Sequence, residues 1–148
     1  MADLNEKVVS FLKNNKVATV CFVTTDNMPY CINCFYAYDE KNNMLVFKSS
    51  FGTSHDTFIK PDAPVSGTIL PNSVSLLNAK GIQFSGKLIN PTEIDYLKLP
   101  SLYTKNYVMS LAMLGYIWAV RLEFIKYTDN SLGFGNKIIW HLEKPSQK

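Results

Sequence analysis

Charge of one sign and long apolar runs are both scarce in this sequence. Fifteen Lys and Arg residues face twelve Asp and Glu residues, so the net charge is only +3, and the charges are interspersed. Because no basic run is present, we expect no nucleic-acid partner. The best apolar run, residues 108–120, is shorter than the roughly 18 residues of a membrane span, and the N-terminus has no apolar leader. The sequence therefore predicts a soluble, cytoplasmic protein that does not enter a membrane.

Cysteine and histidine are also few, with three and two residues respectively. Cys31 and Cys34 form a lone C-x-x-C pair inside a predicted strand, where side chains three positions apart point to opposite faces. That spacing suits neither a shared metal ion nor a redox pair, and His55 and His141 are the only histidines that could add zinc ligands. We therefore predict no metal site, and reduced, buried thiols at Cys31 and Cys34.

The length and composition indicate one globular domain over residues 1–148. Hydrophobic residues make up 47% of the chain and charged residues 18%, which is enough apolar surface to form a single core. Neither an internal repeat nor a linker-like stretch divides the sequence, so we expect no second domain.

Short apolar segments separated by turn residues predict a mainly β fold. Strands are predicted at residues 17–24, 30–38, 44–47, 65–70, 81–88, 118–124 and 137–142. The first of these is almost wholly apolar, which predicts burial on both of its faces. Because no regular crossover helices separate the strands, an antiparallel barrel or strongly curled sheet of six or seven strands is expected.

Two helices accompany the predicted strands. Apolar residues recur at helical spacing over residues 4–12, after a capping box formed by Asp3 and Glu6. The sequence N-P-T-E at residues 90–93 supplies an N-cap, a first-turn proline and an acidic residue, which predicts a second helix start. That helix is expected to fade at Pro100, either ending there or resuming after it.

The segment F-K-S-S-F-G-T-S-H-D-T-F at residues 47–58 crowds hydroxyls, a lysine and a histidine around a glycine. One interpretation is structural, with Thr53 or its neighbour capping helical turns predicted at residues 53–59. The other is an anion site, in which the helix start and the hydroxyls offer donors, while Lys48 and His55 supply charge matched to a phosphate monoester. The segment lacks G-x-x-x-x-G-K-[ST], so it is not a nucleotide-triphosphate loop.

Five segments, in this order along the chain, resemble a known family. They are C-F-Y-A-Y-D at 34–39, T-S-H at 53–55, A-P-V-S-G-T at 63–68, G-I-Q-F-S-G at 81–86 and I-K-Y-T-D-N-S-L-G-F-G at 125–135. With the leading helix, they are similar to the pyridoxamine 5′-phosphate oxidase-like proteins, and among these to a poorly characterised conserved bacterial family. The resemblance covers most of the chain, and it implies a split β-barrel of six to seven antiparallel strands with two or three helices.

The resemblance also implies FMN as the cofactor, bound between the subunits of a homodimer. The FMN phosphate would lie at the end of the third strand and the start of the short helix. The flavin ring would lie along the second strand and meet a glutamine of the partner subunit, to which Gln83 corresponds. The implied cofactor-binding residues are Ile32, Asn33, Cys34, Phe47, Lys48, Ser49, Ser50, Thr53, Ser54, His55 and Gln83.

The function implied by the resemblance is an FMN-dependent oxidoreductase that transfers hydride between the flavin and an unknown small molecule. The alternative is a flavin- or haem-binding carrier of the same fold without turnover. A third hypothesis is a barrel that keeps the fold and binds no ligand. Ser54 and His55 stand where the oxidase has an Arg and Lys pair, and the carboxy-terminal segment that grips pyridoxamine phosphate is lacking, so vitamin B6 oxidation is not expected. No catalytic side chain is assigned. Five aromatic residues are candidates to line a substrate site: Phe35, Tyr36, Trp118, Phe134 and Trp140.

Overall fold

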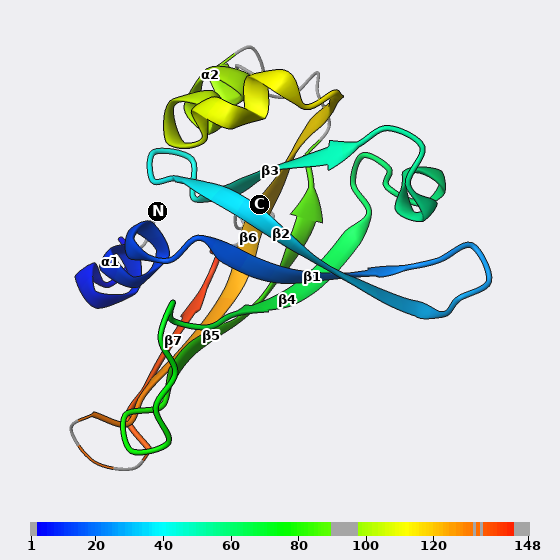
Figure 1. Cartoon of the computed structure of the whole chain (residues 1–148). Coiled ribbons are helices and arrows are strands. Elements are labelled where there is room, and N and C mark those ends of the chain that lie inside the picture. Colours follow the sequence, from blue (N-terminus) through cyan, green and yellow to red (C-terminus); the bar gives the residue numbers. More distant parts are fainter. Residues whose placement is uncertain (1–2, 90–97, 132, 134, 144–148) are drawn as a thin grey trace.

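Seven antiparallel strands form the body of the molecule, and six of them close into a barrel (Figure 1). The computed structural model describes residues 3–89, 98–131, 133 and 135–143. Its strands are β1 (Val17–Val23), β2 (Pro29–Asp39), β3 (Met44–Ser50), β4 (Pro64–Ile69), β5 (Lys80–Leu88), β6 (Gly115–Asp129) and β7 (Lys137–His141). They are ordered β3-β2-β1-β4-β5-β6-β7, and an additional β3–β6 pairing closes the barrel and leaves β7 outside it. The predicted mainly β, antiparallel barrel is confirmed.

The first helix, α1 (Glu6–Asn14), packs against the barrel through Val8, Phe11 and Leu12, which join the interior core. Its N-cap is Asn5, whose side-chain oxygen accepts a hydrogen bond from the Lys7 N–H at 2.9 Å. The predicted capping box of Asp3 and Glu6 is therefore wrong, because that box requires Asp3 as the N-cap and the observed N-cap lies two residues later.

The second helix, α2 (Lys98–Asn106), lies outside the barrel beside β3 and β6, as Figure 1 shows. The predicted helix start at residues 90–93 falls outside the described residues. The prediction that the helix fades at Pro100 is wrong, since α2 runs through this residue. Pro100 is the third residue of α2 in the structure, and a proline in the first turn removes no intrahelical hydrogen bond.

Two apolar clusters bury the strands, one inside the barrel and one beneath α2. β3 contributes Phe47 to the interior and Val46 to the outer cluster, so it is buried on both faces. β1 was expected to be buried on both faces, and this is wrong: Ala18 points inward, whereas Val17 is exposed. The reason is that α2 covers the outer face of β3, whereas no described helix covers that of β1.

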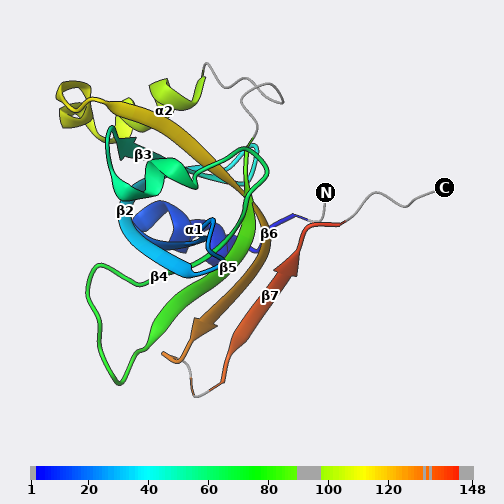
Figure 2. The same ribbon diagram turned by 90° about the vertical axis from the view of Figure 1, so that its right-hand side faces the viewer.

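The longest strand, β6, pairs with three other strands. Its first half pairs with β3, its second half with β5, and its last residues also pair with β7, which runs alongside it in Figure 2. Two short 3-10 helices complete the fold: η1 (Ser54–Thr57) follows β3, and η2 (Val108–Ala112) lies between α2 and β6. Among the described residues, no helix is long and apolar enough to cross a membrane.

Candidate functional site

The predicted phosphate-binding residues begin inside β3 rather than after it. The strand was predicted to end at Phe47 but continues to Ser50, so successive side chains alternate between its two faces. Phe47 is buried in the barrel interior, and Ser49, on the same face, is only 2% exposed. Lys48 faces the opposite side, toward α2 and η2. The alternation therefore separates Lys48 from Ser49.

On the Ser49 side, two hydroxyls and an imidazole form a cluster. Gly52, with a φ of 70°, turns the chain so that His55 returns toward β3. The Nε2 atom of His55 lies 2.8 Å from the Ser49 Oγ and 3.0 Å from the Thr53 Oγ1. The Thr53 hydroxyl also donates to the Ser50 carbonyl at 3.1 Å. The hydrogen bond to Ser50 uses the only hydroxyl hydrogen of Thr53. In the hydrogen bond between Thr53 and His55, the imidazole is therefore the donor.

The structure contradicts the interpretation that the Thr53 side chain caps the short helix η1. This residue occupies the N-cap position of η1, but its side chain makes no capping hydrogen bond. Its hydroxyl instead contacts His55 and the carbonyl of Ser50. Ser54, the first residue of η1, is exposed beside the cluster. The hydroxyls of Ser49 and Thr53 are therefore directed at the imidazole, and that of Thr53 does not cap the helix.

On the opposite face of β3, the Lys48 Nζ donates a hydrogen bond to the Ser110 carbonyl at 2.7 Å. Both residues line a cavity of about 650 Å³ beneath α2 and η2, together with Thr104, Tyr116 and Trp118. Of the aromatic candidates from the sequence, Trp118 lines this cavity. No sequence signal pointed to Thr104 or Ser110, because the cavity exists only where α2 and η2 pack over β6.

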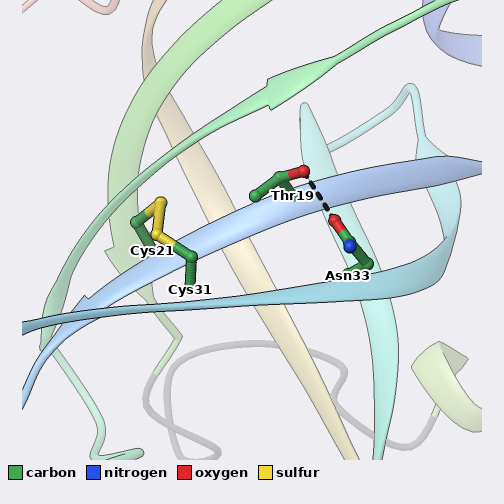
Figure 3. Close-up of a disulfide and its surroundings, with 4 residues drawn as sticks. All are labelled: Thr19, Cys21, Cys31 and Asn33. Atoms are coloured by element: carbon green, nitrogen blue, oxygen red, sulfur yellow. Dashed lines mark hydrogen bonds between the residues drawn. A yellow bond between two sulfur atoms is a disulfide. The ribbon is translucent and has the colours of Figure 1, made fainter.

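The β2 segment that was predicted to contact the flavin ring has side chains on both faces of the sheet. Ile32 and Cys34 are partly buried against the barrel core, whereas Asn33 is exposed on the outer surface. The Thr19 hydroxyl of β1 donates to the Asn33 Oδ1 at 2.7 Å (Figure 3). Only Asn33 of this trio is therefore open to a ligand lying on the outer face of the sheet.

Gln83 lies on the polar, exposed face of β5, as its strand pattern predicted. The register aligns Asn33, Thr19, Thr68 and Gln83 in one row across β2, β1, β4 and β5. Three strand spacings of about 4.8 Å place Gln83 roughly 14 Å from Asn33 within one chain. The two amides are therefore too far apart to contact one face of the same small ring.

A disulfide joins Cys21 to Cys31 (Figure 3), so the prediction that Cys31 is a reduced thiol is wrong. The two residues are directly opposed in the β1–β2 register, with Cα atoms 4.1 Å apart. Cys21 and Cys31 are each five residues from Asp26 at the centre of the hairpin turn, so an antiparallel register about that residue pairs them. Cys34 remains a free thiol, as predicted, and burial raises its pKa to about 12, so it stays neutral at physiological pH.

The other aromatic candidates have structural environments. Tyr36 is buried and donates its hydroxyl to the Leu12 carbonyl at 2.9 Å. Phe35 is exposed on the outer face and packs against the ring of Tyr107. Trp140 is partly buried on β7 against the interior core. The remaining candidate, Phe134, lies outside the described residues.

Several solved structures share this fold at low sequence identity. A haem-binding protein from Mycobacterium smegmatis matches with a TM-score of 0.75 and 15% identity, over 92% of this chain and 57% of that chain. A FAD-binding protein from Mesorhizobium loti matches with a TM-score of 0.64 and 15% identity, over 85% and 95% of the two chains. A Clostridium acetobutylicum protein of the pyridoxinephosphate oxidase family gives 0.61 and 11%, over 92% of each. The molecule is therefore a barrel of the fold class that these proteins share.

Sequence relatives narrow this class to one family. A UPF0306 protein from Cronobacter sakazakii is 31% identical over 138 residues, which span 93% of this chain and 95% of that protein. A UPF0306 protein from Photorhabdus laumondii is 33% identical over 130 residues, 88% of this chain and 90% of the relative. No family model matches the chain. On the identity and coverage of these relatives, the chain belongs to the UPF0306 family.

Proposed function

We propose that this protein binds FMN and is an FMN-dependent oxidoreductase acting on a small molecule. The observation that carries the proposal is the cluster of Ser49, Thr53 and His55 at the end of β3. It lies in a fold that is also found in a FAD-binding protein and in a member of the pyridoxinephosphate oxidase family. Bound FMN would supply hydride transfer, and the protein would supply binding and orientation.

The donor chemistry of the cluster fits a phosphate monoester. Phosphate oxygens accept hydrogen bonds. The cluster contains two hydroxyls, whose hydrogens can rotate from their present acceptors toward a ligand, and an imidazole that becomes a cation when protonated. The exposed hydroxyl of Ser54 adds a further donor at the same turn. Because the amine of Lys48 lies on the other face of β3, we assign the phosphate contacts to His55 and the hydroxyl groups.

The row of Asn33, Thr19, Thr68 and Gln83 supports a flavin ring bound between two subunits. Amide and hydroxyl groups suit the pyrimidine edge of the ring, which carries both donors and acceptors. Since Asn33 and Gln83 of one chain are roughly 14 Å apart, we propose that Gln83 of a second copy completes the site. Exposed apolar residues on the same outer face, Val17, Val23, Phe35 and Leu70, support burial of this face in a homodimer.

Haem binding without turnover is the second candidate, and the likeness to the haem-binding protein from Mycobacterium smegmatis favours it. Haem iron requires an axial ligand such as histidine, cysteine, methionine or tyrosine. His55 fits this role less well than phosphate binding, because its Nε2 atom is held by two hydroxyls. FMN therefore remains the first proposal.

The experiment is a titration of the purified protein with FMN, followed by quenching of flavin fluorescence. We expect saturable binding, and FMN-dependent oxidation of NADH or NADPH if the protein is an enzyme. Haemin added separately would give a sharp Soret band if the haem alternative holds. A colourless protein that quenches no FMN fluorescence would overturn the proposal, while FMN binding without turnover would indicate a carrier.

The homodimer is tested by sedimentation velocity at micromolar concentration. We expect a species of twice the 16.8 kDa chain mass. A charge placed on the outer face by Phe35→Glu should dissociate it, whereas Leu76→Glu, on an exposed loop, should not. A monomeric wild-type protein would contradict the two-subunit site.

A further inference from the structure

The cavity of about 650 Å³ beneath α2 and η2 is not used by the flavin contacts proposed above. Its volume lies within the range of small-molecule binding sites. Apolar residues make up most of its described lining, including Pro100 of α2, Leu111 of η2 and Ile117 of β6. Tyr116 and Trp118 also border it, but they pair with Ser49 and Phe47, so their side chains lie on the other face of the sheet. The polar contribution comes mainly from Lys48 and Thr104. Such a lining indicates a ligand with an apolar body and one polar end.

Lys48 is the only charged residue among the described residues that line the cavity. Its amine, half-buried, carries three N–H donors, one of which is directed at the Ser110 carbonyl. The ion pairs among the described residues are Lys13–Glu40 and Lys80–Asp129, and neither involves Lys48. A partly buried cation beside apolar walls is poorly solvated, so an anion in the cavity would be bound favourably.

The backbone around the cavity holds Lys48 close to the apolar side chain of Ile117. Lys48 is paired with Ile117 across β3 and β6, and Ser50 with Gly115. A Cβ at Gly115 would lie 2.2 Å from the Ser49 carbonyl oxygen, so only glycine allows the two strands to approach this closely here. Lys48 and Ile117 are thereby held side by side on the cavity face of the sheet.

We infer that this cavity binds a carboxylic acid with an apolar body, with the carboxylate at Lys48 and the apolar body against Leu111 and Ile117. The Thr104 hydroxyl, which lines the same cavity, offers a second donor to the carboxylate. The inference does not depend on flavin binding, because it rests on Lys48, α2 and η2, whereas the proposed phosphate contacts lie on the other face of β3.

The test uses 2-naphthoate as the probe and 2-naphthamide as its uncharged counterpart, with binding measured by isothermal titration calorimetry. We expect the acid to bind more tightly than the amide. Lys48→Met should weaken naphthoate binding about ten- to a hundredfold, the usual effect of losing a charge-assisted hydrogen bond. Lys48→Arg should retain most of the affinity. Lys87→Met, at an exposed lysine of β5 outside the cavity lining, should change nothing.

A second variant tests the inference without altering Lys48. Leu111 lines the cavity and is 71% exposed, so Leu111→Glu should fold normally and place a negative charge at the cavity mouth. We expect weaker binding of naphthoate and little change for naphthamide. Thermal melting of each variant separates a loss of binding from a loss of folding.

Three results would overturn the inference. The first is equal binding of naphthoate and naphthamide, and the second is unchanged naphthoate affinity in a folded Lys48→Met variant. The third is displacement of naphthoate by FMN, because one site would then hold both ligands. His55→Ala is the matched control: it should weaken FMN and leave naphthoate unaffected, so failure of either proposal is seen separately.

Discussion

Two clusters of polar side chains, one near each end of β6, differ in the groups at their centre. At one end, the Asp129 carboxylate accepts hydrogen bonds from Tyr127 and Ser131 and pairs with Lys80 at 3.4 Å. Near the other end, Ser49, Thr53 and His55 bring together two hydroxyls and an imidazole. The first cluster is built around a carboxylate, whereas the described side chains of the second are hydroxyls and an imidazole that can become a cation, which suits an anion.

The comparison explains what the sequence motifs do. Asp129, Asn130 and Ser131 belong to the longest motif, I-K-Y-T-D-N-S-L-G-F-G, and their hydrogen bonds shape the turn between β6 and β7. The short motif T-S-H at residues 53–55 supplies two members of the candidate phosphate cluster. The more specific motif therefore has a structural role among the described residues, and the weaker one lies at the candidate site.

The largest expected effect on stability comes from Gly115→Ala. The added Cβ would meet backbone atoms of Ser49, which cannot turn aside, so β3 and β6 must separate. We expect a loss of about 2–3 kcal/mol in the free energy of unfolding, measured by urea denaturation. Ser50→Ala, at the exposed residue paired with Gly115, is the control and should change stability by less than about 0.5 kcal/mol. Equal stability of both variants would show that the strands tolerate separation.

The opposite end of β6 is tested by Asp129→Asn. Partial burial acts to raise the pKa of Asp129, but hydrogen bonds from Ser131 and Tyr127, with the charge of Lys80, outweigh it and lower this pKa from 3.8 to about 2. The carboxylate therefore stabilises the fold above pH 3.8, and this contribution is lost as the pH falls through about 2. We expect the variant to lose about 1–2 kcal/mol at pH 7.

The pH dependence of the stability loss distinguishes a lost carboxylate interaction from a general loss of packing. The stability difference between wild type and Asp129→Asn should shrink as the pH is lowered toward 2. Asp26→Asn, in the exposed β1–β2 turn, is the control and should match wild type throughout. A difference that is constant with pH would contradict the assigned carboxylate network.

The smallest effect on stability is expected for Thr53→Ala. Because Thr53 does not cap η1, its removal should cost only about 0.5–1 kcal/mol, the value of a neutral hydrogen bond, rather than the up to 2 kcal/mol of a lost cap. The same variant should weaken FMN binding several-fold. Thermal melting and FMN titration of one preparation measure both effects, and a large loss of stability with unchanged FMN affinity would support the capping interpretation.

Much of the fold could be predicted because hydrophobic patterning and turn residues are local signals. The seven strands were placed to within a few residues, apart from β6, which is longer than predicted at both ends. The burial of β3 rather than β1 on both faces could not be read from apolar content, because it depends on where α2 packs. The Cys21–Cys31 disulfide was missed because it follows from hairpin register rather than from sequence spacing.

The candidate site was predicted in part. The T-S-H motif contains Thr53 and His55, which the structure brings together with Ser49. Lys48 was assigned to the same group because it is adjacent in sequence, but the extension of β3 to Ser50 places its side chain on the opposite face. The cavity on that face could not be predicted, since it depends on the tertiary packing of α2 and η2.

The central claim is that the hydroxyl and imidazole cluster holds the phosphate of FMN. The most direct measurement compares the affinities of FMN and riboflavin for wild type and His55→Ala, with Lys48→Met as the control on the other face of β3. We expect His55→Ala to weaken FMN binding about ten- to a hundredfold, or roughly 1.5–3 kcal/mol, and to leave riboflavin unaffected, because riboflavin has no phosphate. Equal weakening of both ligands, or no change in either, would contradict the account.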